Sequence, residues 1–319
     1  MQKNRIYKLS MLLAFAFLGI FPAQAQKAPA ATTPVQMTVT LNTLGENKRT
    51  PEVNIEDVIV RQGSDRLQVT GWTPLREDRA GLDLFILIDD ASHPVLGSQF
   101  DDLRSFINAL PPNTSIGVGY MRNGTVQIAQ DLTTDHAQAT KALRLPLASN
   151  GAYGNPYLSA IDLMKRWPDD SKRREIVMVS DGIDRFRSAQ RYRGLRFISP
   201  DVDSASRVAQ RTGTTINTIF ARGVGRMANN FWEITNGQNG MAKLSEETGG
   251  QSFYLGTQNP VSFKPYLDEL QRNLDNKYVL EFRAVPGPKP GLQYVKLSTE
   301  VAGVELDSAD SVWVSARAR

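Results

Sequence analysis

The sequence predicts an α/β fold, a doubly wound and mainly parallel sheet, accompanied by a small β-rich module. Between residues 82 and 276, short apolar runs alternate with segments in which apolar residues recur at helical spacing. Residues 84–88 and 176–179 are apolar without a break, as in strands buried on both faces. The flanking segments, 36–77 and 278–319, carry strand patterns and no helical one.

The first 25 residues have the pattern of a secretory signal peptide. A basic head precedes an apolar run over residues 11–21, and Ala23-Gln24-Ala25 provides a cleavage site of small residues. The run is shorter than the roughly twenty residues of a membrane-spanning helix. We therefore expect an exported protein, periplasmic or secreted, without stable membrane insertion.

Composition narrows the possible functions. The formal net charge is +4, and residues 1–25 hold three of the positive charges, so the remaining chain carries about +1. This balance argues against nucleic-acid binding, which needs a strongly basic face. The chain has no cysteine, so its stability must come from a core without disulfides.

The two ends of the chain are expected to form one β-rich module. Residues 26–35 are small and proline-rich, which predicts a flexible linker. Neither the N-terminal β segment (36–77) nor the C-terminal one (278–319) has enough strands to be stable alone, so we expect them to pair. The expected strands are 35–41, 58–61 and 67–72 in the first segment, and 278–284, 293–301 and 311–314 in the second.

Between these segments, residues 78–277 are expected to form the α/β domain. Pro111-Pro112 ends its first helix, and the dipeptide Asn123-Gly124 predicts a hairpin between two strands. The expected strands are 82–89, 115–121, 125–129, 175–180, 214–220 and 251–255, and the expected helices are 98–110, 135–143, 157–167, 205–211, 239–248 and 263–276.

Acidic and polar residues follow two of the buried strands. Asp89, Asp90, Ser92 and His93 come at the end of one strand, and Asp181 comes at the end of another. Ligands of open α/β sheets bind at the carboxyl ends of the strands. We therefore expect these side chains to meet at one functional edge of the sheet.

With these strand ends and helices in order, residues 82–276 resemble the von Willebrand factor type A domain. The β segment upstream and the strand that starts at Tyr278 are similar to those of exported bacterial members of that family. The motifs that carry the resemblance are Asp83-Leu-Phe-Ile-Leu-Ile-Asp89, Thr133-Thr-Asp, Gly154-Asn-Pro-Tyr-Leu-Ser-Ala-Ile, Val177-Met-Val-Ser-Asp-Gly and Leu244-Ser-Glu-Glu-Thr-Gly-Gly-Gln-Ser-Phe.

The resemblance implies a site for a divalent cation, usually magnesium. In the family an Asp-x-Ser-x-Ser turn, a threonine and a second aspartate hold it, and a partner's carboxylate completes the shell. Asp89 and Asp181 match the two aspartates, but Ala91 and His93 replace the serines, and Asn155 replaces the threonine. The candidate ligands of Mg2+ or another divalent cation are therefore Asp89, His93, Asn155 and Asp181, in a degenerate site of weakened affinity.

These residues also have structural interpretations. Asp89 and Asp181 would serve as well to cap helices or to pair with nearby arginines. His93 would serve as a solvated turn residue. A register shifted by one restores an Asp-x-Ser pair from Asp90 to Ser92, but it puts a proline at the second serine position.

A basic stretch follows the second strand-end aspartate. Residues 172–196 contain eight basic side chains against three acidic ones, interleaved with aromatic residues. Because arginine forks suit carboxylates, this stretch predicts an acidic protein partner, and a solvated loop is the alternative. The expected partner contacts are Asp90, Ser92, Arg185, Arg187, Arg191 and Arg193.

Together these patterns favour a non-enzymatic protein-interaction or adhesion module. Its partner would dock at the rim formed by residues 89–94, 151–156 and 181–196. The alternative is a structural scaffold or assembly component of an envelope complex with no metal site. A metal hydrolase that uses Asp89 and Asp90 is a third hypothesis, although the two histidines show no triad arrangement.

Overall fold

The computed structural model describes residues 32–43, 51–76, 81–148, 154–168, 172–186 and 198–316. The expected signal peptide and residues 26–31 of the expected linker lie outside these ranges. Residues 33–35 of that linker instead begin a strand, β1 (Thr33–Thr43), because β10 provides their backbone partners. Within the described ranges, no helix combines the length and the apolar character needed to cross a membrane.

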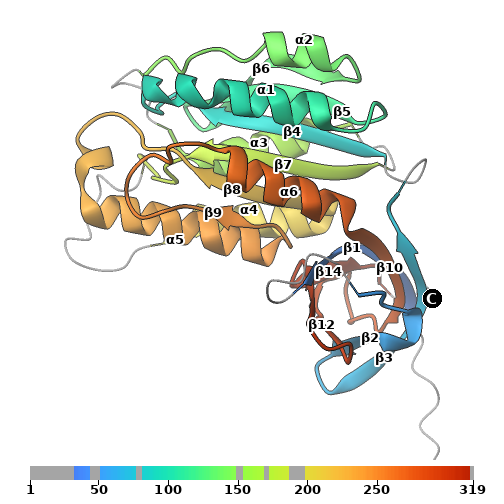
Figure 1. Ribbon diagram of the computed structural model, residues 1–319. Helices are drawn as coiled ribbons and strands as arrows, with labels where there is room; N and C mark the ends of the chain where they lie inside the picture. The colour runs from blue at the N-terminus through green and yellow to red at the C-terminus, as the bar shows by residue number, and fades with distance from the viewer. Residues whose placement is uncertain are drawn as a thin grey trace, which may run out of the picture. The chain divides into compact units, whose positions relative to one another are not determined.

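A six-stranded sheet forms the centre of the α/β domain and confirms the expected doubly wound, mainly parallel fold (Figure 1). The strand order is β6-β5-β4-β7-β8-β9, so the chain starts in the middle and adds strands first on one side and then on the other. Every neighbouring pair is parallel except the β5–β6 hairpin. The strands are β4 (Leu82–Asp89), β5 (Ser115–Arg122), β6 (Thr125–Thr133), β7 (Arg173–Ser180), β8 (Thr214–Phe220) and β9 (Ser252–Phe253).

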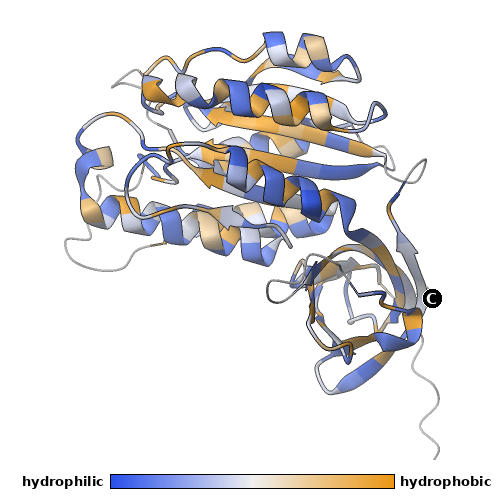
Figure 2. Cartoon of the chain, in the orientation of Figure 1, coloured by the Kyte–Doolittle hydropathy of each residue, from blue (hydrophilic) through white to orange (hydrophobic). Residues whose placement is uncertain are grey.

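Helices cover both faces of this sheet. One core forms between the sheet and α1, α2 and α6, and a second between the sheet and α3, α4 and α5. All eight residues of β4 are buried, as its apolar run predicts, and Figure 2 shows the apolar character of the central strands. The helices are α1 (Phe100–Ala109), α2 (His136–Lys141), α3 (Pro156–Arg166), α4 (Pro200–Thr212), α5 (Phe231–Glu247) and α6 (Lys264–Asp275), with short 3-10 turns η3 (Pro94–Gln99) and η5 (Met227–Asn229).

Two local predictions have different outcomes. The Asn123-Gly124 hairpin is confirmed, since both residues have positive φ (53° and 71°), as a type I′ turn requires. The start of α5 was predicted wrongly, because the helix begins at Phe231 rather than at residue 239. Two glycines, Gly237 and Gly240, lower the helix propensity of this segment. They are nevertheless needed, since a Cβ at either position would overlap neighbouring atoms.

The N- and C-terminal segments form the expected β-rich module. Its larger sheet has the order β12-β2-β3-β10-β1-β13, and β11 and β14 pair separately. Strand β10 from the C-terminal segment lies between β3 and β1 from the N-terminal one. The remaining elements are η1 (Ile55–Asp57), β2 (Val58–Gln62), β3 (Asp65–Pro74), β10 (Lys277–Ala284), β11 (Gly291–Tyr294), β12 (Lys296–Thr299), β13 (Val304–Ser308) and β14 (Ser311–Val314).

Candidate functional site

Asp89 is the last residue of β4, and its carboxylate is buried. The N–H of Ala91 donates to Oδ1 (2.8 Å), and the hydroxyl of Ser180 donates to Oδ2 (2.8 Å). Ser180 ends the neighbouring parallel strand, β7. The two strand ends are therefore tied together, and Asp181, the next residue, is brought to the same edge of the sheet as Asp89.

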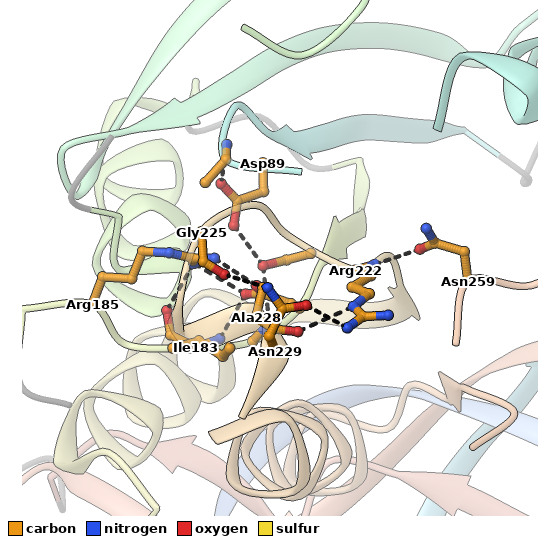
Figure 3. A network of polar contacts seen from close by, with 12 residues as sticks. Asp89, Ile183, Arg185, Arg222, Gly225, Ala228, Asn229 and Asn259 are labelled. Atoms are coloured by element: carbon orange, nitrogen blue, oxygen red, sulfur yellow. Dashed lines mark hydrogen bonds and ion pairs between the residues drawn. The ribbon is translucent and has the colours of Figure 1, made fainter. Parts of the chain in front are cut away.

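Asp181 is paired with a buried arginine. Nη2 of Arg185 lies 2.6 Å from Oδ2 of Asp181, and Nη1 lies 3.1 Å from Oδ1. This two-point geometry is the strongest way for arginine to bind a carboxylate. Arg185 also donates from its backbone N–H to the Gly154 carbonyl (2.8 Å) and from Nη1 to the Ile183 carbonyl (3.4 Å), and Figure 3 shows it near Asp89.

The inward position of Arg185 corrects one of the sequence predictions. Arg185 was expected to contact a partner at the surface, but its exposed fraction is only 8%. The carboxylate of Asp181, four residues earlier, holds the guanidinium inside the domain. The arginine therefore belongs to the same charge cluster as the two aspartates.

Gly223 allows the backbone to lie against this ion pair. Residues 91–93 and 222–224 form a short antiparallel bridge, in which Val224 donates to the Ala91 carbonyl (2.8 Å). A Cβ at Gly223 would overlap both Oδ2 of Asp181 and Nη2 of Arg185. The loop that follows is held by the Arg222 side chain, which donates to Asn229 and to the Ala228 carbonyl (Figure 3).

The charges of this cluster are strongly coupled. Burial raises the pKa of Asp89, the positive charge of Arg185 opposes this rise, and the negative charge of Asp181 adds to it. Burial alone would lower the pKa of Arg185, but the carboxylates of Asp181 and Asp89 outweigh it and raise the pKa. The guanidinium is therefore a permanent cation beside the two acidic side chains.

Asn155, expected to offer its carbonyl oxygen to a metal, caps a helix instead. Its Oδ1 accepts hydrogen bonds from the N–H groups of Tyr157 and Leu158 (3.0 Å each), in the first turn of α3. Its Nδ2 donates to Asp201 (2.7 Å). The side chain is fully buried, so both of its polar ends are committed to the fold.

Asn155→Ala is therefore expected to lower the free energy of unfolding by about 1–2 kcal/mol, the usual effect of removing a helix N-cap. Urea denaturation followed by circular dichroism measures the change. Asn155→Ser should restore part of the loss, because a serine hydroxyl can accept the same hydrogen bonds. An alanine variant as stable as the original chain would show that this cap contributes nothing.

Asp90 and Ser92, expected to contact a partner, are also buried. Arg144 binds the Asp90 carboxylate at two points (2.7 and 3.1 Å), and its guanidinium carbon lies 3.7 Å from the ring centroid of Tyr120. The Ser92 hydroxyl has no hydrogen-bond partner among the described residues. Because neither side chain reaches the surface, these two positions do not provide partner contacts.

The remaining candidates are divided between the surface and undescribed parts of the chain. His93 is exposed, and its Nδ1 accepts a hydrogen bond from the N–H of Val95 (3.2 Å), so that it caps η3 as a turn residue. Arg187, Arg191 and Arg193 lie outside the described residues.

A divalent cation does not fit this arrangement. Both oxygens of Asp181 face the guanidinium of Arg185, and both oxygens of Asp89 already accept hydrogen bonds. Both oxygens of Asp90 are bound by Arg144, so Asp90 is not free to share a metal ion with Asp89 as the hydrolase hypothesis requires. In the part of the chain that the structure describes, no three His, Cys, Asp or Glu side chains are grouped to hold a metal.

Most of the large exposed apolar side chains lie at the same edge of the α/β sheet as the charge cluster, and apart from the aromatic residues of the 172–196 stretch the sequence did not predict them. Two of the large apolar side chains exposed in the described ranges, Tyr294 and Trp313, belong to the β-rich module. All the others lie at the carboxyl-terminal edge of the α/β sheet, either in connections or, as Val95, Phe231 and Trp232 do, in the first turn of a helix. We call this set the apolar rim: Val95, Leu145, Leu147, Phe186, Ile198, Phe231, Trp232, Tyr254, Leu255 and Val261.

Two aromatic residues dominate one part of the apolar rim. Phe231 and Trp232 lie in the first turn of α5 and are 61% and 56% exposed. Their rings pack edge to face, with 5.7 Å between the ring centroids. Gln238 of the same helix donates to the Gly256 carbonyl (2.6 Å), next to the rim residue Leu255. The aromatic pair is thus held on a helix rather than on a free loop.

Comparisons with known proteins give only distant likenesses. No family model matches the chain, and no curated protein matches it. An aerotolerance-related membrane protein from Bacteroides fragilis is a structural match with 12% identity and a TM-score of 0.43, and the match covers 61% of this chain and 99% of that one. BatB from Bacteroides thetaiotaomicron matches with 12% identity and a TM-score of 0.42, covering 61% of this chain and 97% of that one.

A third structural match is the ArnB paralog VWA2 from Sulfolobus acidocaldarius, with 12% identity and a TM-score of 0.38. This match covers 90% of the present chain and 76% of the archaeal one. At these levels of identity and TM-score, the likenesses assign neither an activity nor a partner.

Proposed function

We propose that this α/β domain, of von Willebrand type A fold, is an exported, non-enzymatic protein-interaction module whose partner docks on the apolar rim. One observation supports the proposal above the others. Of the twelve large apolar side chains exposed in the described ranges, ten lie at one edge of the α/β sheet, whereas scattered single residues are the rule on ordinary surfaces. Ligands of open α/β sheets use the same edge. Export is supported by the signal-peptide pattern of residues 1–25.

Aromatic anchors are expected to carry most of the affinity. Tryptophan is among the residues most often found at the centre of protein interfaces, where truncation of an anchor costs about 2 kcal/mol or more. Phe231 and Trp232 offer such an anchor, because they are exposed and fixed at the start of α5.

The partner is proposed to be acidic. The three acidic residues of the 172–196 stretch, Glu175, Asp181 and Asp184, are all buried. Of its eight basic residues, Arg174 and Arg185 are buried as well and four lie outside the described residues, so the proposal rests on the basic composition of the stretch. Charge of opposite sign on the partner would speed association and favour the correct orientation.

The test is capture of partners from a cell-envelope extract by immobilised residues 26–319. A rim variant, Phe231→Ser with Trp232→Ser, is expected to reduce the amount of each specifically captured protein by about tenfold or more. The matched control changes the two exposed aromatic residues of the β-rich module, Tyr294→Ser with Trp313→Ser, and should capture the same proteins as the original chain.

The reverse pattern would support the scaffold alternative. If the Tyr294 and Trp313 variant loses the captured proteins while the rim variant keeps them, the chain binds through its β-rich module. Both variants must first show the melting temperature of the original chain, so that a loss of capture reports the surface and not the fold.

A further inference from the structure

We propose that Arg185 permanently fills the cation position beside Asp181 and Asp89, and that its guanidinium excludes divalent metal ions from this site. The inference concerns the charge cluster alone and does not depend on where a partner docks. It replaces the weakened cation site expected from the sequence with a site that carries its own positive charge.

The first argument is electrostatic. Asp89 and Asp181 place two carboxylates at neighbouring strand ends, and a cation is needed to offset them. Arg185 provides it, with 2.6 and 3.1 Å contacts to Asp181 and an electrostatic effect on Asp89. A divalent ion bound by the same carboxylates would lie next to the guanidinium and be repelled by it.

The second argument is that the position of the guanidinium is built into the fold. Arg185 is fixed at its backbone by Gly154 and at its side chain by Asp181 and the Ile183 carbonyl. The absence of a side chain at Gly223 leaves the space that Nη2 occupies. A metal ion would have to displace a group held by several hydrogen bonds.

The third argument is the state of the oxygen atoms that a metal would need. Each carboxylate oxygen of Asp89 and Asp181 already accepts a hydrogen bond. The carbonyl oxygen of Asn155 accepts two backbone N–H groups. Magnesium binds oxygen ligands in a nearly ideal octahedral shell. Among the side-chain oxygens of Asp89, Ser92, Asn155 and Asp181, only the Ser92 hydroxyl has no hydrogen-bond partner in the described residues.

The test is metal binding by purified residues 26–319, measured by isothermal titration calorimetry and by thermal melting in EDTA, MgCl2 or MnCl2. The original chain is expected to show no saturable binding and the same melting temperature in all three solutions. Arg185→Ala should gain saturable Mn2+ binding, with a dissociation constant on the order of 0.1–1 mM, similar to that of weak extracellular calcium sites. Adding Asp181→Ala to this variant should remove the binding.

Further variants separate charge from shape. Arg185→Gln keeps a planar hydrogen-bonding group without the charge, so it should also gain Mn2+ binding, and it serves if Arg185→Ala does not fold. Arg185→Lys keeps the charge and should exclude the metal. Arg104→Ala, which removes an exposed arginine paired with Asp101, is the matched control and should behave like the original chain.

Two results would overturn the proposal. Saturable Mg2+ or Mn2+ binding by the original chain that is lost in Asp181→Ala would mean that the metal displaces the arginine. Folded Arg185→Ala and Arg185→Gln variants that still bind no Mn2+ would mean that Arg185 is not what excludes the metal. Neither measurement involves a partner. If the metal-exclusion proposal fails, the docking proposal is unaffected, and a failed capture experiment does not bear on metal exclusion.

Discussion

Replacing Arg185 with alanine is expected to lower the free energy of unfolding by about 3–5 kcal/mol at neutral pH, the usual effect of removing one partner of a buried ion pair. The buried carboxylate of Asp181 would lose both guanidinium contacts, which leaves the Ile183 N–H as its hydrogen-bond donor among the described residues. Asp89 would lose the positive charge that opposes the effect of its burial. Urea denaturation curves of the two chains measure the difference.

The loss should depend on pH in a defined direction. Burial already raises the folded-state pKa of Asp89 above its ordinary value, and removal of Arg185 should raise it further. A carboxyl group with a raised folded-state pKa contributes stability below its unfolded pKa, and this contribution is lost as the pH rises through the folded pKa. The variant should therefore lose less stability, relative to the original chain, at about pH 5 than at about pH 8.

The control for this prediction is an arginine–aspartate ion pair at the surface of the domain. Arg104 lies 2.9 Å from Asp101, whose side chain is 93% exposed, so Arg104→Ala should change stability by less than about 0.5 kcal/mol. An Arg185→Ala variant that changes stability as little as this control would show that the Asp181–Arg185 pair is not a buried, charged contact in solution.

A second large effect is expected at Gly182, the residue between Asp181 and Ile183. Its φ is +70°, and a Cβ there would overlap the backbone carbonyl of Gly237 and the side chain of Met241, both in α5. Because backbone atoms cannot move aside as a flexible side chain can, α5 would have to shift. Gly182→Ala should therefore lower the free energy of unfolding by about 3 kcal/mol or more, above the roughly 1–2 kcal/mol of a left-handed conformation alone.

Gly213 offers a matched control for this effect. It has nearly the same backbone conformation (φ +65°), but a Cβ there would meet no atom within 4 Å. Gly213→Ala should cost about 1–2 kcal/mol, the price of the left-handed conformation alone, and the difference between the two variants isolates the close approach of α5. Equal losses of stability, measured by urea denaturation, would contradict the packing argument.

Much of the architecture could be predicted from local patterns. The apolar runs that end at Asp89 and Ser180 are long enough to require burial on both faces, and parallel strands bring their ends to one edge. The meeting of Asp89 with the end of β7 follows from this. The start of α5 did not follow, because Gly237 weakens the local helix signal, and the reason for a glycine there is the close approach of the Asp181 carbonyl and the backbone of Gly182, which the sequence does not show.

The chemistry of the site was harder to predict. An arginine four residues after an aspartate has the same spacing whether it points to solvent or inward. Its direction is fixed here by Gly223, about forty residues further along the chain, which leaves the necessary space. Trp232 was missed for a related reason, since its exposure depends on which neighbours the rest of the fold supplies and not on its own segment.

The position of β10 between β3 and β1 means that the β-rich module is completed only by the C-terminal segment of the chain. All strands of the α/β sheet precede β10 in the chain, and α6, which packs on that sheet, ends two residues before β10 begins. The α/β domain is therefore complete in sequence before the β-rich module receives its inner strand. Until then β1 and β3 have unpaired backbone edges of the kind that attract other chains. The C-terminal β segment, residues 278–319, therefore completes the β-rich module. Until it pairs, we expect the free edges of β1 and β3 to be the parts of this module that most readily associate with other chains.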